Sequence, residues 1–154
     1  MLFALALVLA AVPDAGVAPS VMVDGDGLTA TSFTLEQLKK LGPVSVEWKD
    51  KTGAHRFTGV RVEKLLMQAG FTEKARHEEL RASLIAIATD GFAAVFSVGE
   101  VLEAIGPSNV ILAWEQDGKP LPAEHGVFRL VVPTDKRGAR SIYQLVRIRL
   151  SNAR

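Results

Sequence analysis

The sequence has 154 residues, of which 48% are hydrophobic and 23% charged, and this composition is typical of one folded domain with a single core. It contains no cysteine, which excludes disulfides, thiolate zinc sites, iron–sulfur clusters and cysteine nucleophiles. The formal net charge is only +1, and no motif combines basic and aromatic residues in the way that nucleic-acid-binding proteins do, so a nucleic-acid partner is not expected.

The first residues form an apolar segment that is too short to cross a bilayer as a helix. It runs from Met1 to Val12 and continues through small residues to Ala18, which predicts a secretory signal peptide over residues 1–18 and one domain over residues 19–154. The protein is therefore expected to be periplasmic or otherwise exported, without stable membrane insertion after cleavage. No Lys or Arg precedes the apolar run, so a start further upstream or an N-terminal anchor also stays open.

Three helices are predicted from their end signals. Two begin with capping boxes, Thr34-Leu35-Glu36-Gln37 and Ser97-Val98-Gly99-Glu100, in which a hydroxyl and an acid or amide satisfy free amides of the first turn. They are expected to end at Gly42-Pro43 and Gly106-Pro107. The third covers about Val62 to Ala69, before Gly70.

Six strands are predicted between these helices from runs of β-branched and aromatic residues. They are Val44–Trp48, Leu84–Ala88, Phe92–Phe96, Val110–Glu115, Phe128–Val132 and Leu145–Leu150. Tight turns are expected at Asp90-Gly91 and Asp117-Gly118, because glycine accepts the positive φ that such turns need. Glu73 to Arg81 is expected to be a charged loop or a frayed helix. Short strands that alternate with short helices predict a mixed α+β domain.

Generic catalytic motifs are not found. The three histidines, His55, His77 and His125, match no metal-binding spacing, and no serine lies in a nucleophile elbow. The region from Arg129 onward contains seven basic residues and one acid, Asp135, which suits an anionic ligand or partner but is equally typical of a solvated surface.

Three segments in a fixed order carry a resemblance to a known family. The first is His55-Arg56-Phe57-Thr58-Gly59-Val60, which runs into Leu65-Leu66, and the second is Thr89-Asp90-Gly91-Phe92. The third, Asn109 to Leu150, contains Leu121-Pro122, Gly126, Arg129, Pro133 and Gly138-Ala139-Arg140. This order is similar to that in the molybdopterin-binding domain of the sulfite oxidase family, over roughly residues 33–150.

The resemblance implies mixed β-sheets with a few short helices and a pterin cofactor whose molybdenum takes one cysteine thiolate from the protein. The family's spacing places that cysteine near Glu47, and a carboxylate is a hard ligand that does not replace a thiolate. Molybdenum ligation by a thiolate is therefore not expected. The chain also departs from the family in the spacing between His125 and Arg129 and in having Tyr143 where a lysine is usual.

The candidate site residues follow from the shape of a pterin, which has a flat face and an edge of donors and acceptors. Glu47 or Asp90 is expected to accept bonds from the edge, and Trp48, Trp114, Phe92 or Tyr143 to stack on the face. We expect Arg129 and Arg140 to contact the ligand, with Arg137 and Ser141 binding a phosphate if one is present and His125 near the family's ligand position. Several of these residues also have a structural alternative. Glu47 could point outward from its strand, Asp90 could shape its turn, and Trp114 could pack in the core. Arg129 and Arg140 could form structural salt bridges, and Arg137 and Ser141 could lie in an exposed loop.

Small exported relatives without the cysteine bind pterins without metal, and some report to membrane signalling enzymes. The resemblance to them predicts a non-catalytic periplasmic pterin-binding protein, with molybdopterin or a metal-free pterin as ligand, that acts as a sensor for the periplasmic domain of a membrane signalling protein. Two alternatives stay open. One is a molybdopterin-dependent oxidoreductase that holds its cofactor without a cysteine ligand, and the other is a ligand-free interaction domain that uses its basic C-terminal region.

Overall fold

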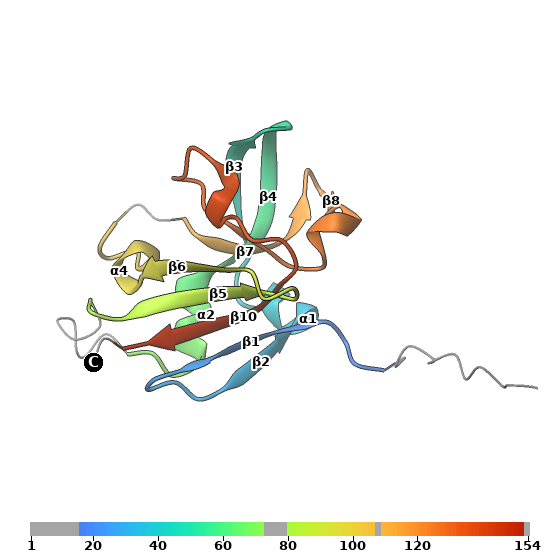
Figure 1. The fold of residues 1–154 in the computed structure, drawn as a ribbon. Coiled ribbons are helices and arrows are strands. Elements are labelled where there is room, and N and C mark those ends of the chain that lie inside the picture. The colour runs from blue at the N-terminus through green and yellow to red at the C-terminus, as the bar shows by residue number, and fades with distance from the viewer. Residues whose placement is uncertain (1–15, 73–79, 107–108, 153–154) are drawn as a thin grey trace, which may run out of the picture.

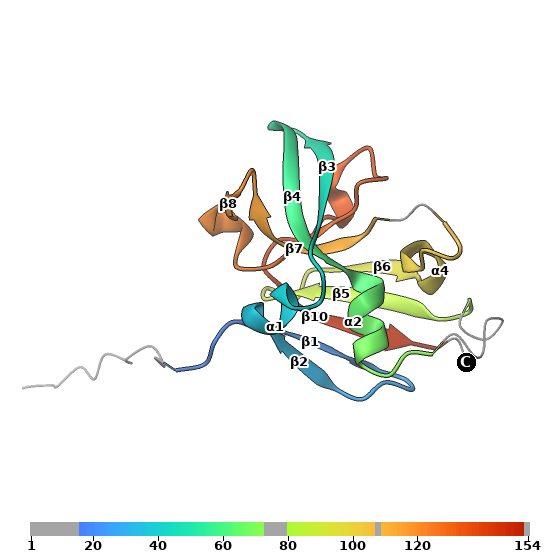
Figure 2. The same ribbon diagram turned by 180° about the vertical axis from the view of Figure 1, so that it is seen from behind.

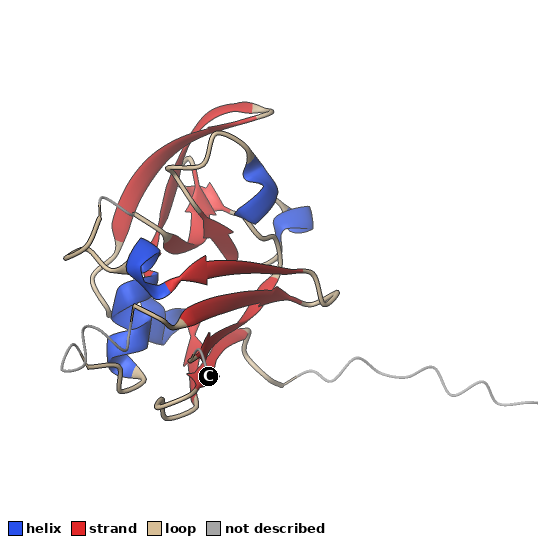
Figure 3. Ribbon diagram, turned by 60° about the vertical axis from the view of Figure 1, so that its left-hand side comes forward, coloured by secondary structure: helices blue, strands red, loops and turns tan. Residues whose placement is uncertain are grey.

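The computed structural model describes residues 16–72, 80–106 and 109–152, and within these ranges the chain forms two five-stranded β-sheets with a few short helices (Figure 1). Strands make up most of the regular secondary structure, and the helices lie beside the sheets (Figure 3). The predicted α+β class is confirmed. The predicted signal peptide falls almost wholly on residues 1–15, outside the described residues, as does most of Glu73 to Arg81.

The first sheet has the order β2-β1-β10-β5-β6. Its strands are β1 (Ser20–Gly25), β2 (Thr31–Thr34), β5 (Ser83–Ala88), β6 (Ala93–Ser97) and β10 (Leu145–Ser151). β1 and β10 pair in parallel, and the other neighbours are antiparallel. Alternate residues of β5 and β6 are buried, so one face of this sheet covers the main core.

The second sheet has the order β3-β4-β7-β8, with β9 also paired to β7. Its strands are β3 (Val44–Asp50), β4 (Gly53–Arg61), β7 (Ile111–Gln116), β8 (Lys119–Pro120) and β9 (Arg129–Val131). β3 and β4 form a long hairpin that rises away from the first sheet in Figure 1. Its tip is therefore free to form one wall of a site between the sheets.

The helices pack along the base of this arrangement. α1 (Leu35–Lys39) and α2 (Val62–Gln68) lie on one side of the first sheet in Figure 2, and α4 (Val98–Val101) follows β6. Leu38, Leu65 and Leu66 are fully buried in the core that both sheets share. Two 3-10 turns, η2 (Ala123–His125) and η3 (Gly138–Arg140), flank β9. None of the described helices is long and apolar enough to cross a membrane.

Both predicted capping boxes are confirmed, as are the turns at Asp90-Gly91 and Asp117-Gly118. The predicted helix after Ser97 is shorter than expected, because α4 ends at Val101 and Leu102 is already extended. The sequence analysis also missed β1 and β2, and it treated the segment of β4 as a motif and not as a strand.

β4 and β7 approach each other closely at Gly59. The register between these strands shifts between Thr58 and Gly59, and a Cβ atom on Gly59 would lie 2.1 Å from the carbonyl oxygen of Leu112. Because that atom belongs to the backbone, the strands would have to separate to admit a side chain.

We predict that Gly59→Ala lowers the free energy of unfolding by about 3 kcal/mol, as expected for overpacking against backbone. Urea unfolding followed by tryptophan fluorescence measures the change. Gly106→Ala is the control, because a Cβ there meets no atom within 4 Å, and its effect should stay within about 0.5 kcal/mol. Equal stability of the two variants would show that the strand contact is not tight.

Candidate functional site

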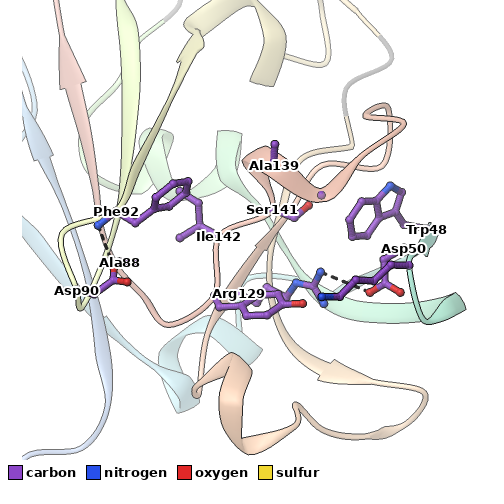
Figure 4. A pocket seen from close by; sticks show the side chains of 12 residues that line it. Trp48, Asp50, Ala88, Asp90, Phe92, Arg129, Ala139, Ser141 and Ile142 are labelled. Carbon is purple, nitrogen blue, oxygen red and sulfur yellow. Dashed lines mark hydrogen bonds and ion pairs between the residues drawn. The ribbon is translucent and has the colours of Figure 1, made fainter.

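A cavity of about 500 Å³ lies between the tip of the β3–β4 hairpin and the β5–β6 turn (Figure 4). The segment from η3 to the start of β10 borders it, and Arg129 of β9 reaches it from below in Figure 4. Its lining residues are Trp48, Asp50, Lys51, Ala88, Asp90, Phe92, Arg129, Gly138, Ala139, Ser141, Ile142 and Tyr143. The cavity is thus assembled from both sheets, and its volume suits a small ring compound.

Arg129 is the most buried charged residue at this site, with only 1% of its surface exposed. Its guanidinium carbon lies 4.5 Å from the ring centre of Tyr143, 4.9 Å from that of Phe57 and 5.4 Å from that of Trp48. The faces of aromatic rings attract a cation, so these contacts partly replace the lost hydration of the guanidinium.

The hydrogen-bonding capacity of Arg129 is largely unused by the described residues. Nη1 lies 3.4 Å from Nδ1 of His125, Nη2 lies 3.8 Å from Oδ2 of Asp50, and the buried Nε has no partner. A guanidinium has five N–H donors, and leaving a buried donor unpaired costs about 1–3 kcal/mol. The arrangement therefore leaves donors for a further group in the cavity.

His125 does not line the cavity, but it contacts two residues that do, Tyr143 and Arg129. Its ring centre is 4.0 Å from that of Tyr143, and 7% of the residue is exposed. Burial and the nearby charge of Arg129 lower the pKa of His125, so the imidazole is neutral at pH 7 and its Nδ1 accepts from Arg129. The imidazole ring therefore packs against Tyr143 and accepts from Arg129.

Asp50 is the charged partner of Arg129 and was missed by the sequence analysis. Its Oδ1 accepts hydrogen bonds from the backbone N–H of Thr52 at 2.7 Å and from the Thr52 hydroxyl at 2.5 Å. Burial would raise the pKa of Asp50, but these two bonds, followed by the charge of Arg129, outweigh burial and hold that pKa below its ordinary value. The cavity therefore contains an ionised carboxylate at neutral pH.

The turn that carries Asp50 is fixed to a neighbouring turn. The hydroxyl of Thr52 lies 2.7 Å from Nε2 of His55, and Nδ1 of His55 lies 2.7 Å from a carboxylate oxygen of Asp117. Asp117 also accepts a bond from the backbone N–H of Arg56. These contacts join the β3–β4 hairpin to the β7–β8 turn and hold Asp50 in place.

Aromatic side chains form the walls of the cavity. Trp48 is buried, and its Nε1 donates to the backbone oxygen of Asp135 at 2.8 Å. Phe92 lies across the cavity from Trp48 in Figure 4 and is 54% exposed, and Tyr143 is 37% exposed. A flat apolar ligand would find aromatic surface on more than one side.

Six of the predicted site residues line the cavity: Trp48, Asp90, Phe92, Arg129, Ser141 and Tyr143. Two of these also have local structural roles. Asp90 accepts a bond from the N–H of Phe92 and so shapes the β5–β6 turn, and the hydroxyl of Ser141 accepts a bond from the N–H of Val132. The structure brings these residues together from four separate segments of the chain.

The other predicted residues lie outside the cavity. Glu47 is exposed on the opposite face of β3 from Trp48 and pairs with Arg56 at 3.1 Å, so it is the outward strand residue of the alternative interpretation. Arg137 is exposed, and Trp114 is buried in the core.

Arg140 is held in an ion-pair network and does not reach the cavity. It donates to both oxygens of Asp135, at 2.9 and 2.7 Å, and to Glu100 at 2.9 Å, while its guanidinium covers the ring of Phe96. The bonds to Asp135 raise the pKa of Arg140 above its ordinary value. The expectation that Arg140 contacts a ligand is therefore replaced by a structural role, which is to fix η3 against α4.

The basic C-terminal region does not form one free cationic surface. Arg129 is buried, Arg140 is paired, and Arg147 forms an ion pair with Asp24. Within the described ranges, no cluster of three or more His, Asp or Glu side chains is placed to hold a metal ion.

Comparison with known proteins agrees with this architecture. The sequence profile of the oxidoreductase molybdopterin binding domain matches residues 12–154. Among solved structures, the fold is similar to that of the sulfane dehydrogenase SoxCD from Paracoccus pantotrophus, with a TM-score of 0.71 and 20% sequence identity. That match covers 88% of this chain and 39% of the solved chain, so this chain spans well under half of its length. A comparison with curated proteins gives no match.

We predict that Arg140→Ala lowers the free energy of unfolding by about 1–2 kcal/mol, because it removes several charge-assisted hydrogen bonds from a side chain that is one-third exposed. Urea titration at pH 7 gives the value. Arg137→Ala is the matched control in the same loop, since Arg137 is exposed, and should change stability by less than about 0.5 kcal/mol. Equal losses for the two variants would contradict the role given to Arg140.

We further predict a pH-dependent contribution from Asp50. Because its pKa is lower in the folded protein than in the unfolded chain, its stabilisation is complete above the unfolded pKa and is lost as the pH falls through the folded value. Asp50→Asn should therefore be less stable than wild type by about 1–2 kcal/mol at pH 7, and the difference should shrink below about pH 4. Thermal unfolding across this range is the measurement.

The control is Asp90→Asn, which keeps an oxygen acceptor for the N–H of Phe92 and should stay within about 0.5 kcal/mol of wild type at pH 7. A stability difference between wild type and Asp50→Asn that stays constant down to pH 3 would refute the ionic role of Asp50.

Proposed function

Because the chain belongs to the oxidoreductase molybdopterin binding domain family, we propose that it binds a pterin in the cavity beside Arg129 and acts as a binding protein without catalysing oxygen-atom transfer. The observation that carries the proposal is that Arg129 lines a cavity with aromatic walls while its buried Nε has no partner among the described residues. A ligand with oxygen or nitrogen acceptors would supply the missing bonds.

The residues present are suited to a pterin ring. Trp48, Phe92 and Tyr143 offer aromatic surface for the ring's face, and Arg129 with Asp50 offers a donor and an acceptor for its edge. The volume of about 500 Å³ leaves space for a bicyclic ring and part of its side chain. These features support binding of a pterin by side chains alone.

The donor set is not suited to the family's usual attachment of molybdenum. The sequence contains no cysteine, so it provides no thiolate. Asp50, the carboxylate nearest Arg129, has one oxygen occupied by two bonds from Thr52, and a hard oxygen ligand does not reproduce the properties of sulfur. We therefore propose no catalytic step for this chain.

In the proposed complex, the side chains bind and orient the ring and exclude water. Tyr143, supported by His125, stacks on the ring, and Arg129 donates to its carbonyl or ring nitrogens. Phe92 covers the open side of the cavity from the β5–β6 turn. Because Thr52 holds Asp50 in place and His125 lies against Arg129, ligand binding would require little rearrangement of these side chains.

We also propose that the protein works outside the cytoplasm as a sensor. The apolar segment of residues 1–18 supports export, and the lack of a metal-ligating thiolate supports a role in reporting a ligand instead of converting it. The partner would be the periplasmic domain of a membrane signalling protein. Cell fractionation followed by immunodetection tests the location, and co-purification tests the partner.

The decisive experiment is to purify the full chain from the periplasm, denature it, and identify the released small molecule by mass spectrometry and by fluorescence after oxidation. We predict one pterin per chain and molybdenum well below one atom per chain. Stoichiometric molybdenum would instead favour an oxidoreductase that holds its cofactor without a cysteine ligand. A clean protein that binds no added pterin would favour a ligand-free interaction domain.

A further inference from the structure

Asp50 and Arg129 present an acceptor and a donor side by side at the wall of the cavity (Figure 4). Oδ2 of Asp50 lies 3.8 Å from Nη2 of Arg129, which is too far for a hydrogen bond between them. The two groups therefore form an ion pair without a hydrogen bond between them, so Oδ2 and Nη2 can each bond to another group.

Other contacts hold the two side chains in place and leave some of their polar atoms available for a ligand. Oδ1 of Asp50 accepts both hydrogen bonds from Thr52, whereas Oδ2 accepts no hydrogen bond from the described residues. Arg129 is 1% exposed, its Nη1 is 3.4 Å from His125, and its Nε lacks a partner. Recognition of a ring edge that carries donors and acceptors requires polar groups that are buried, held in place and not fully hydrogen-bonded, and Asp50 and Arg129 meet this requirement.

We propose that Asp50 and Arg129 select the 2-amino-4-oxo edge of the pterin ring, an inference that rests on the function proposed above. This edge carries an amino donor, an N–H donor and a carbonyl acceptor in a row. The free Oδ2 of Asp50 accepts from the adjacent amino and N–H donors, and Arg129 donates to the carbonyl, so the charges and the order of polar groups match. The site thereby distinguishes 2-amino pterins from rings with a second carbonyl at that position.

The discrimination has a simple electrostatic cause. In lumazine, the 2,4-dioxo analogue, the amino group is replaced by a carbonyl oxygen. That oxygen would face the ionised carboxylate of Asp50, and two acceptors opposed in a buried site leave each other unsatisfied. Stacking on Tyr143 and Trp48 is the same for both rings, so the edge alone sets the preference.

The test compares the dissociation constants of pterin and lumazine, measured by quenching of tryptophan fluorescence. We expect the wild-type chain to bind pterin at least about tenfold more tightly than lumazine, as a hydrogen bond to a charged group predicts. In Asp50→Asn, the preference should fall to within about threefold of unity. The control Glu47→Gln changes an exposed carboxylate on the same strand, outside the cavity, and should keep the wild-type preference.

A second measurement changes the ligand instead of the protein, so it does not depend on whether the Asp50 variant folds. 3-Methylpterin lacks the N–H donor but keeps the rings, and the wild-type chain should bind it about tenfold more weakly than pterin. Equal wild-type affinities for pterin and lumazine, or a preference retained by a folded Asp50→Asn, would overturn the edge recognition while leaving pterin binding intact. Failure to bind either ring would remove the proposed function together with this inference.

Discussion

The burial of the Arg129 guanidinium is the constraint around which the site is organised. An isolated charge in a protein interior is costly, so the surroundings must replace the water it loses. Here the replacement comes from separate segments: Trp48 and Asp50 from β3, Phe57 from β4 and Tyr143 from the loop before β10. Each must be in position for the charge to be tolerated, so Arg129 couples the β3–β4 hairpin to the segment that joins the two sheets. The same contacts leave its Nε without a hydrogen-bond partner among the described residues.

The position of the hairpin depends in turn on a backbone contact. Gly59 lets β4 approach the carbonyl of Leu112 in β7, at the register shift between Thr58 and Gly59. Below this point β4 continues into Arg61 and α2, which packs in the main core, and above it the hairpin extends toward the cavity. The glycine of the motif His55 to Val60 is thus explained sterically, because a side chain at this position would collide with the backbone of β7. The hairpin's tip is then tied to the β7–β8 turn through His55 and Asp117, so the wall that carries Asp50 is stiff.

Local signals explain which parts of the structure were predictable. The capping boxes at Thr34 and Ser97 involve residues three apart, so the sequence contains the whole interaction. β1 could not be recognised in this way, because its parallel pairing is with β10, more than a hundred residues later. The predicted carboxylates were Glu47 and Asp90, and Asp90 lines the cavity. On β3, however, the lining carboxylate is Asp50 and not Glu47, because an odd number of positions along a strand changes the face on which a side chain lies. The bond between Arg140 and Glu100 could not be predicted for a similar reason, since 40 positions separate the two residues.

The unpaired Nε of the buried Arg129 also bears on the proposed binding of a ligand. A buried ion pair is seldom the most stable solution, because apolar side chains of similar volume often fill the same space at no loss of stability. Stability alone therefore does not account for Arg129 with an unpaired Nε beside a cavity. A ligand that accepts from Arg129 and donates to Asp50 would supply a partner to each group and would bridge the hairpin and the β5–β6 turn through Trp48 and Phe92. Because the hairpin is already stiff, the proposed sensing would rest on the difference between the empty and the filled cavity, and it would require no chemistry at the ring.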